Sequence, residues 1–453
     1  MTTTLTEFQE LKPASSVNTS PFVLNKLAQR IENRQELEQQ LARLQFHGIA
    51  TPYKEKEKKI IQVKYQNIYL VAVFQQKILG IFQQIKRKND NWINDSLMKT
   101  AEKNKFASLE KIPRKLEHKR VTGLAIRAVY ALNLDYALVK IGVAVGTKPY
   151  VLNINSLPED NEELAPLFEK KILDFIEKWE NKVNNWSKAT ILGADLEFML
   201  QGNNGKLILA SKYLPKKGLA GCDQIWVNQD RTQLPLAELR PLPAKEPRDL
   251  VINIYKSMVV ASKRIKDMDV KWLAGALPIK GYPIGGHIHF SQTWLNSFLL
   301  RALDNYLALM ITVFEDKQGL ARRPKYGFLG DYREQFHGGF EYRTLPSWIV
   351  SPELAKGVIA LAKLIVENYI YLEQNPLEEM AIQQAYYSGD KAVLRPVVIK
   401  LWEELKELKD FSLYKNYLQP LENLLVNEYS WDETKDIRIR WLLPPYHKKT
   451  KSS

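Results

Sequence analysis

Four arginines and Glu341 lie among glycine, tyrosine and proline residues in the stretch from Arg322 to Trp348, a composition typical of a site rather than of a core. Phe340–Thr344 alternates apolar and polar residues, so a strand here would place Glu341 and Arg343 on one face. A carboxylate and a guanidinium are then presented on the same surface. A surface ion pair is the ordinary alternative and would stabilise little, but the additional arginines in this stretch favour a functional site.

Three upstream segments show the same alternation, and each would present two polar side chains on one face: Asp195 with Glu197, Glu238 with Arg240, and His287 with His289. If the four strands share a sheet, one face is densely charged and the other is apolar. Burying these charges is unfavourable unless cations or an anionic ligand compensate them. Carboxylates with an imidazole suit a hard divalent metal, and arginines suit a phosphate or carboxylate bound bidentately. The pattern therefore predicts a site for a Mg–nucleotide and an acid substrate.

Two of these pairs also have ordinary structural interpretations. His287 and His289 could be one structural and one solvated histidine, but Gly285 and Gly286 precede them, and glycines permit close approach of a ligand. Asp195 is alternatively a turn residue or an outer partner of the site, so it ranks below Glu197 as a ligand.

The motifs occur in the order D-x-E, E-x-R, G-G-H-x-H-F-S, R-R-P-x-Y-G and E-Y-R-x-L-P-S-W. This order resembles the carboxylate-amine ligase (amidoligase) branch of the glutamine synthetase and glutamate-cysteine ligase superfamily, most closely the phage-type ligases. The resemblance covers residues 190–375, and motifs that are each weak alone become fairly specific in this order. One departure concerns the turn expected before the E-x-R strand, where Gln224 follows Gly221–Asp223 in place of the glycine of a G-x-D-G pattern.

The resemblance implies that ATP phosphorylates a substrate carboxylate and that an amine attacks the acyl phosphate to form an amide or isopeptide bond, with ATP and Mg²⁺ as cofactors. The implied metal ligands are Glu197, Glu238, His289 and Glu341, with Asp195 as an additional ligand. The implied catalytic residues are Arg322, Arg333 and Arg343. The implied nucleotide contacts are Arg322, Arg323, Arg333, Arg240, His287 and Ser291. Arg240 is alternatively a contact of the substrate carboxylate.

The N-terminal part resembles a degenerate ATP-grasp fragment. Lys140 and Asn153 occupy positions where ATP-grasp proteins are expected to have metal-binding carboxylates. Asn155 is the expected metal ligand that is still present. A lysine cannot coordinate Mg²⁺ and would repel it. We therefore expect this part to be a scaffold or a substrate-presenting module that binds no nucleotide.

The predicted fold is α+β, with a glutamine synthetase-like antiparallel sheet covered by helices on its apolar face and preceded by the degenerate ATP-grasp-like domain. We expect three parts: 1–187, the amidoligase core 188–375, and a helical extension 376–453. Helices are predicted at 24–44, 120–132, 162–186, 247–266, 293–316, 352–372 and beyond 376, and hairpins within 60–85, 137–154 and 191–211.

Composition limits the class of protein. The chain has 453 residues, 45% apolar and 26% charged, as in soluble globular proteins. No apolar run reaches the ~20 residues that span a bilayer, no secretory signal is evident, and Cys222 is the single cysteine, so no disulfide framework forms. A cytoplasmic protein with small-molecule or peptide acid and amine substrates is expected, with no membrane span. Oligomeric state and the identity of both substrates stay open, although related enzymes can complete sites between subunits.

Two other classes of function remain as alternatives. The net charge of +14 suits a nucleic acid as well as ATP, but the basic loop 86–105 offers Trp92 as its one obvious stacking aromatic, so nucleic acid is disfavoured. The altered N-terminal half would suit a non-catalytic relative, which the intact charged residues of the second half disfavour.

Overall fold

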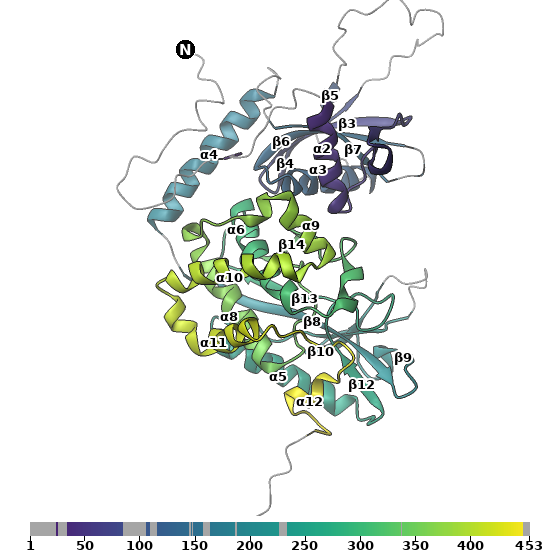
Figure 1. The fold of residues 1–453 in the computed structure, drawn as a ribbon, viewed down its shortest axis with the longest axis vertical. Coiled ribbons are helices and arrows are strands. Elements are labelled where there is room, and N and C mark those ends of the chain that lie inside the picture. The colour runs from purple at the N-terminus through teal and green to yellow at the C-terminus, as the bar shows by residue number, and fades with distance from the viewer. Residues whose placement is uncertain are drawn as a thin grey trace, which may run out of the picture. The chain divides into compact units, whose positions relative to one another are not determined.

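The computed structural model describes residues 24–25, 34–84, 106–108, 116–144, 146, 148–156, 164–185, 188–225, 233–336 and 338–446. The chain forms two compact units, Met1–Asn185 and Trp186–Ser453 (Figure 1). The division falls close to the boundary expected after residue 187. The α+β class with antiparallel sheets is confirmed, whereas the division into three functional parts stays a prediction.

The first unit contains a five-stranded antiparallel sheet with the strand order β5-β4-β3-β6-β7. Its strands are β3 (Asn67–Phe74), β4 (Lys77–Gln84), β5 (Phe106–Ser108), β6 (Tyr136–Val143) and β7 (Tyr150–Asn155), besides the short pair β1 (Tyr53–Lys54) and β2 (Lys59–Ile60) around the 3-10 turn η1 (Glu55–Glu57). Its helices are α2 (Arg34–Phe46), α3 (Leu116–Ala131) and α4 (Ala165–Asn184). The two hairpins predicted in this half are confirmed, and so are the helices predicted at 120–132 and 162–186.

Helices cover both faces of this sheet. Val121 and Ala125 of α3 belong to one core cluster with Val71 and Val139. On the opposite face, Phe175 of α4 meets Phe74 edge to face, with ring centroids 5.7 Å apart. Lys140 and Asn153 are cross-strand partners on β6 and β7.

Several predictions for this half concern residues outside the described ranges. These are residues 26–33 of the helix predicted at 24–44, the basic loop 86–105 with Trp92, and the N-terminal arm 1–21. The basic tail 447–453 at the other end of the chain also lies outside them. The predicted start of the helix at 24–44 is wrong, because Leu24 and Asn25 are described and form a turn in which Asn25 has a φ of 49°.

The second unit is built on an eight-stranded sheet with the order β10-β11-β8-β13-β15-β14, and β9 and β12 also pair with β8. All of its ladders are antiparallel. The strands are β8 (Ile191–Gly202), β9 (Leu207–Ile208), β10 (Ala220–Asp223), β11 (Leu236–Leu239), β12 (Val270–Leu273), β13 (Gly286–Ser291), β14 (Tyr332–Glu334) and β15 (Phe340–Tyr342). The four strands predicted from alternation are therefore consecutive neighbours in a single sheet.

Helices bury the apolar face of this sheet. The helices are α5 (Pro247–Arg264), α6 (Ser297–Ala302), the π-helical η4 (Leu303–Ala308), α7 (Leu309–Phe314), α8 (Pro352–Asn368), α9 (Met380–Ser388), α10 (Lys391–Glu407), α11 (Phe411–Val426) and α12 (Ile437–Trp441), with the 3-10 turns η3 (Ala210–Lys212), η5 (Lys317–Arg322), η6 (Tyr369–Tyr371) and η7 (Pro376–Glu378). Tyr342 donates from the apolar face to Asp304 of η4 over 2.6 Å. The Ser351 side chain caps α8 by accepting from the Leu354 amide, as its sequence predicts.

Helix Ser297–Phe314 is apolar and long enough to cross a membrane by length and composition, but 94% of it is buried inside the unit. Burial of this kind is typical of a core helix, so the helix is only weak evidence for a membrane span.

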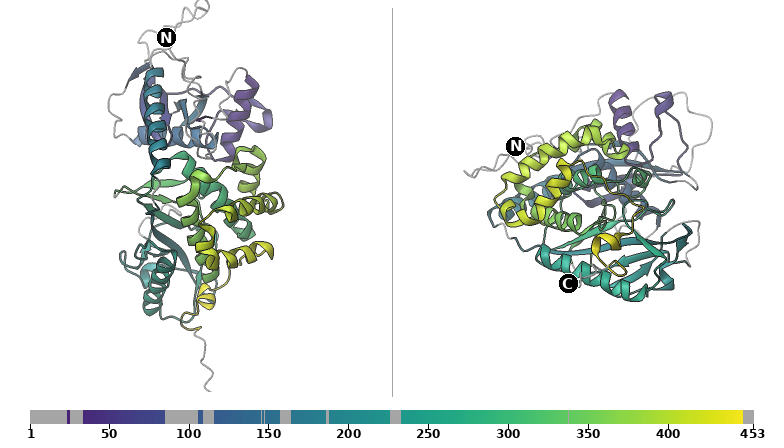
Figure 2. Two further views of the ribbon diagram at one scale, coloured as in Figure 1. Left: turned by 90° about the vertical axis from the view of Figure 1, so that its left-hand side faces the viewer. Right: turned by 60° about the horizontal axis from the view of Figure 1, so that its bottom comes forward.

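The C-terminal helices α10, α11 and α12 pack into the second unit, as Figure 2 shows for the yellow helices. Helix α11 packs along α8. Buried Glu433 accepts hydrogen bonds from the Ala276 amide at 2.5 Å and the Leu277 amide at 2.8 Å. The segment after residue 375 is thus tied to the loop that leads into β13.

Candidate active site

The register of the sheet places the predicted polar residues on one face. Directly opposed residues of neighbouring antiparallel strands project from the same face. The opposed pairs are Glu238 with Glu197, His287 with Asp195, His289 with Glu341, and Arg333 with Glu341. The predicted convergence of carboxylates and imidazoles on one face is therefore confirmed, while their roles as ligands stay predictions.

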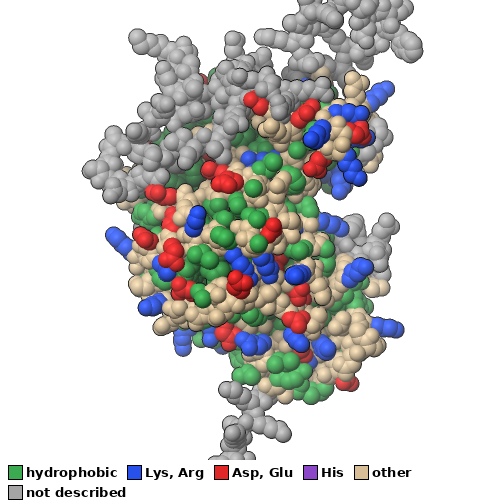
Figure 3. Space-filling model, in the orientation of Figure 1, with side chains coloured by type: hydrophobic (Ala, Val, Ile, Leu, Met, Phe, Trp, Pro, Cys, Tyr) green, Lys and Arg blue, Asp and Glu red, His purple; other side chains and the backbone are tan. Residues whose placement is uncertain are grey.

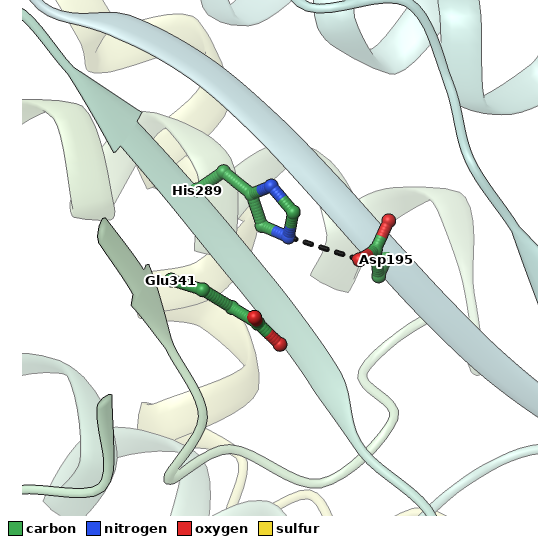
Figure 4. A group of neighbouring side chains, drawn as sticks. All are labelled: Asp195, His289 and Glu341. Carbon is green, nitrogen blue, oxygen red and sulfur yellow. Dashed lines mark ion pairs between the residues drawn. The ribbon is translucent and has the colours of Figure 1, made fainter. Parts of the chain in front are cut away.

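Asp195, His289 and Glu341 form a group of potential metal ligands. One ligand atom from each lies within 4.8 Å of the others, and Figure 4 shows the three side chains approaching from neighbouring strands. His289 Nε2 is 3.1 Å from Asp195 Oδ2, yet this buried nitrogen makes no hydrogen bond. Two ligand atoms this close, one of them lacking a hydrogen-bond partner, suit a shared cation.

Glu341 is fully buried, and its carboxylate contacts several basic side chains. Its Oε1 contacts His287 Nδ1 at 3.1 Å and Arg343, and its Oε2 lies 2.5 Å from Arg333 Nη2. The Gln335 side-chain amide also donates to Oε2 over 2.9 Å. Burial alone would raise the pKa of Glu341, but the hydrogen bond and charge of His287, followed by the two arginines, lower it to about 2. Glu341 is thus ionised under all ordinary conditions.

The surroundings of Glu238 shift its pKa in the opposite direction. Its pKa is raised to about 8, chiefly by burial and then by the charge of Asp195, and the ion pair with Arg240 only partly offsets both effects. The neighbouring Glu197 adds repulsion. Arg240 compensates only part of the charge of these crowded carboxylates, and a divalent cation would compensate the rest.

Backbone geometry allows these side chains to approach one another. Glu197 Oε2 accepts from the Gly285 amide over 2.5 Å, and a Cβ at Gly285 would collide with the His287 ring. Gly285 therefore has to be a glycine if His287 is to keep this position.

Gly221–Asp223 corrects one expectation. The segment expected as a turn is strand β10, with Gly221 opposite Glu238, so Gln224 lies beyond the strand rather than within a turn. A Cβ at Gly221 would collide with Arg240 Nη1. That guanidinium donates to the Lys216 carbonyl over 3.1 Å. The glycine thus makes room for the arginine.

Arg322 and Arg323 do not join the charged face. Arg322 is buried and donates to the carbonyls of Thr344 and Leu345, each over 2.9 Å. Arg323 pairs with buried Glu315 at 2.9 Å. Both guanidinium groups are committed to the protein interior, so the expected phosphate contacts are not supported. Arg322 instead holds the loop that follows β15.

The remaining predicted residues lie on the charged face or at its margin. Arg333 is 60% exposed on β14 and Arg343 is 30% exposed just after β15. Ser291 shares the face of His289 by alternation, at the far end of β13. Gln335 was missed by sequence reasoning, although its position two residues after Arg333 carries the same alternation signal.

Comparison with known proteins gives one match that covers more than half of the chain. The profile of the family described as phage phiEco32-like COOH.NH2 ligase-type 2 matches residues 192–443. No curated protein matches the sequence.

Two solved structures show limited likeness. They are a bifunctional glutathione synthetase from Pasteurella multocida (10% identity, 58% of this chain and 50% of that chain, TM-score 0.33) and a novel glutamine synthase homolog (13% identity, 56% and 70%, TM-score 0.26). The aligned region thus spans half of the glutathione synthetase. Scores this low do not establish a shared fold.

Proposed function

The chain belongs to the family of phage phiEco32-like type 2 COOH.NH2 ligases, and we propose that it joins a carboxylate to an amine by an ATP-dependent route through an acyl phosphate. A carboxylate is a poor electrophile, and phosphorylation provides it with a leaving group. Small molecules and peptides both fit as sources of the acid and the amine.

The observation that carries this proposal is the charge pattern across the sheet. Glu197, Asp195 and Glu238 form an acidic centre, with Arg240 on the β11 side and Arg333 and Arg343 on the β15–β14 side. Negative charge at the centre suits a divalent metal, and positive charge at both margins suits two anionic groups. A nucleotide and an acid substrate are two such groups.

The donor set fits Mg²⁺, because it consists of carboxylate oxygens with one imidazole nitrogen that lacks a hydrogen-bond partner. The residues proposed to hold the metal are Glu197, Glu238, His289, Glu341 and Asp195. When bound, Mg²⁺ supplies charge neutralisation at the transferring phosphoryl group.

The arginines act on the charge that develops during the reaction. A carboxylate oxygen of the acid attacks the γ-phosphorus, and ADP leaves with the electrons of the broken P–O bond. The amine nitrogen then attacks the acyl carbon, phosphate departs, and the nitrogen loses a proton. Arg333 and Arg343 would stabilise the phosphoryl oxygens and the tetrahedral adduct, since Glu341 fixes both guanidinium groups before substrate arrives. Arg240 would bind a carboxylate of the acid.

The test is to incubate the protein with ATP, Mg²⁺ and cell extract, measure ADP, and search by mass spectrometry for a new mass equal to two metabolites minus water. Glu341→Gln and Arg343→Lys should each reduce turnover by about 100-fold or more. Glu403→Gln, an exposed position on α10, is the matched control and should not change turnover. Equal turnover in all four proteins contradicts the proposal.

Nucleic-acid binding rests only on the net charge. On the face shown in Figure 3, lysine and arginine side chains are interspersed with aspartate and glutamate instead of forming a patch of one sign. The described side chains on that face therefore give nucleic-acid binding no additional support.

A further inference from the structure

Glu433 is a fully buried carboxylate in the C-terminal part of the chain. Its Oε1 accepts from the Ala276 amide over 2.5 Å and from the Trp431 indole over 3.3 Å, and its Oε2 accepts from the Leu277 amide over 2.8 Å. Burial is the main reason that the pKa of this carboxyl is raised to about 7, while the N–H groups that it binds lower the pKa. Burying a charge is costly, and the two backbone contacts show what this charge does. It holds the first residues of the loop 276–285.

The loop 276–285 leads from β12 into β13 and ends on Glu197. The Ile284 amide donates to the Ala276 carbonyl over 3.0 Å, which closes the loop at its base. The next residue, Gly285, donates its amide to Glu197 Oε2 over 2.5 Å, and its carbonyl accepts from the Glu197 amide over 3.1 Å. A single backbone hydrogen bond therefore connects Ala276, which binds Glu433, to the residue before Gly285, which binds Glu197.

Ser347 provides a second connection between the same two carboxylates. Its amide donates to the Gly275 carbonyl over 2.8 Å, and its hydroxyl donates to the Glu197 carbonyl over 2.5 Å. Gly275 lies directly against Glu433, because a Cβ at this glycine would come within 2.4 Å of Glu433 Oε1. The carboxylate and the backbone of Glu197 are thus both connected to the segment that Glu433 holds.

We propose that Glu433 is a positioning residue of the active site, which fixes the loop 276–285 and, through Gly285, the orientation of the Glu197 carboxylate. This inference rests on the proposed ligase function and extends the site to the C-terminal part of the chain. A carboxylate that binds a metal is itself held by hydrogen bonds, and loss of such an outer partner commonly lowers metal affinity by about 10- to 100-fold. Glu433 contacts the loop and acts on the metal site through Gly285.

Calorimetric titration with Mg²⁺ at pH 9 tests the inference, because Glu238 and Glu433 are then both largely ionised. Glu433→Gln keeps the size of the side chain but replaces one acceptor oxygen by an N–H donor, which repels a backbone amide. The affinity for Mg²⁺ should fall about tenfold.

Asp436→Asn is the matched control. Asp436 is 4% exposed on the same segment, and its carboxylate binds Arg438, two residues further along the chain. This variant should lower the melting temperature, as Glu433→Gln does, but keep the wild-type affinity for Mg²⁺. A change of affinity without a matching change in the control separates positioning from a loss of stability alone.

A second measurement uses the unmodified protein, so it decides the question even if Glu433→Gln does not fold. Coupling between two sites is reciprocal. If the loop positions Glu197, Mg²⁺ bound at Glu197 must in turn stabilise the loop. Hydrogen exchange followed by mass spectrometry should show exchange of the loop 276–285 slowed about tenfold by Mg²⁺, and more than exchange of α12.

The inference fails if Glu433→Gln binds Mg²⁺ as tightly as the wild type. It also fails if Asp436→Asn loses affinity to the same extent, or if Mg²⁺ slows exchange equally in the loop and in α12. A wild-type protein that binds no Mg²⁺ contradicts the metal site of the proposed function, and this inference with it. That outcome is distinguishable, because the other three require a wild type that binds Mg²⁺.

Discussion

Binding of Mg²⁺ should become tighter as the pH rises, because of Glu238. Burial and the charge of Asp195 raise the pKa of this carboxyl to about 8, despite the ion pair with Arg240. Metal binding requires the ionised carboxylate. A proton must therefore leave Glu238 before the metal binds whenever the pH is below about 8.

The size of the effect follows from this pKa. The ionised fraction of a group with a pKa of about 8 is roughly one tenth at pH 7 and nine tenths at pH 9, so the affinity for Mg²⁺ should rise about tenfold over this range.

Calorimetric titration with Mg²⁺ at pH 7, 8 and 9 measures the effect. Glu238→Gln should bind Mg²⁺ more weakly than the wild type at pH 9 and show no rise between pH 7 and 9. Glu403→Gln again serves as the control and should retain the tenfold rise. A melting curve for each variant shows whether removal of the Arg240 partner has unfolded the protein.

Two results would refute the reasoning. One is a wild-type affinity that is the same at pH 7 and pH 9. The other is a tenfold rise that survives in Glu238→Gln, which would place the titrating group elsewhere.

Folding raises the pKa of Glu238 from 4.5 to about 8, so the stability that this carboxyl contributes is complete below pH 4.5 and is lost as the pH rises through 8. The melting temperature of the metal-free protein should therefore fall between pH 5 and pH 9, by an amount equivalent to at most roughly 5 kcal/mol of unfolding free energy. Addition of Mg²⁺ should restore the melting temperature. Gly221→Ala should displace the Arg240 guanidinium, destabilise the fold by about 1–3 kcal/mol and raise the KM for the acid more than that for ATP; unchanged kinetics would exclude Arg240 from acid binding. Lys140→Ala and Asn153→Ala in the full chain should each bind an ATP analogue with an affinity within about twofold of the wild type, as surface changes outside a site do. A larger loss of affinity would reveal a nucleotide site in the first unit.

Alternation in the sequence determined which side chains of a strand share a face, because the two-residue period of a strand is a local property of the backbone. Asp195 with Glu197, and His287 with His289, could be paired in this way without knowledge of the fold. The order of the motifs also indicated the family.

Tertiary structure decided which strands are neighbours and what each charge meets. Arg322 and Arg323 follow one another in a basic motif, yet they turn into the interior because Thr344, Leu345 and Glu315 satisfy them there. Gly221 lies in a strand because β10 pairs with β11. Glu238 and Glu341 are both strand carboxylates in the sequence, but burial with like charges raises the pKa of the first, and contacts from His287, Arg333 and Arg343, of which His287 is far away in the sequence, lower that of the second. Desolvation and Coulomb energies depend on distances between residues far apart in the chain, and no local period encodes those distances.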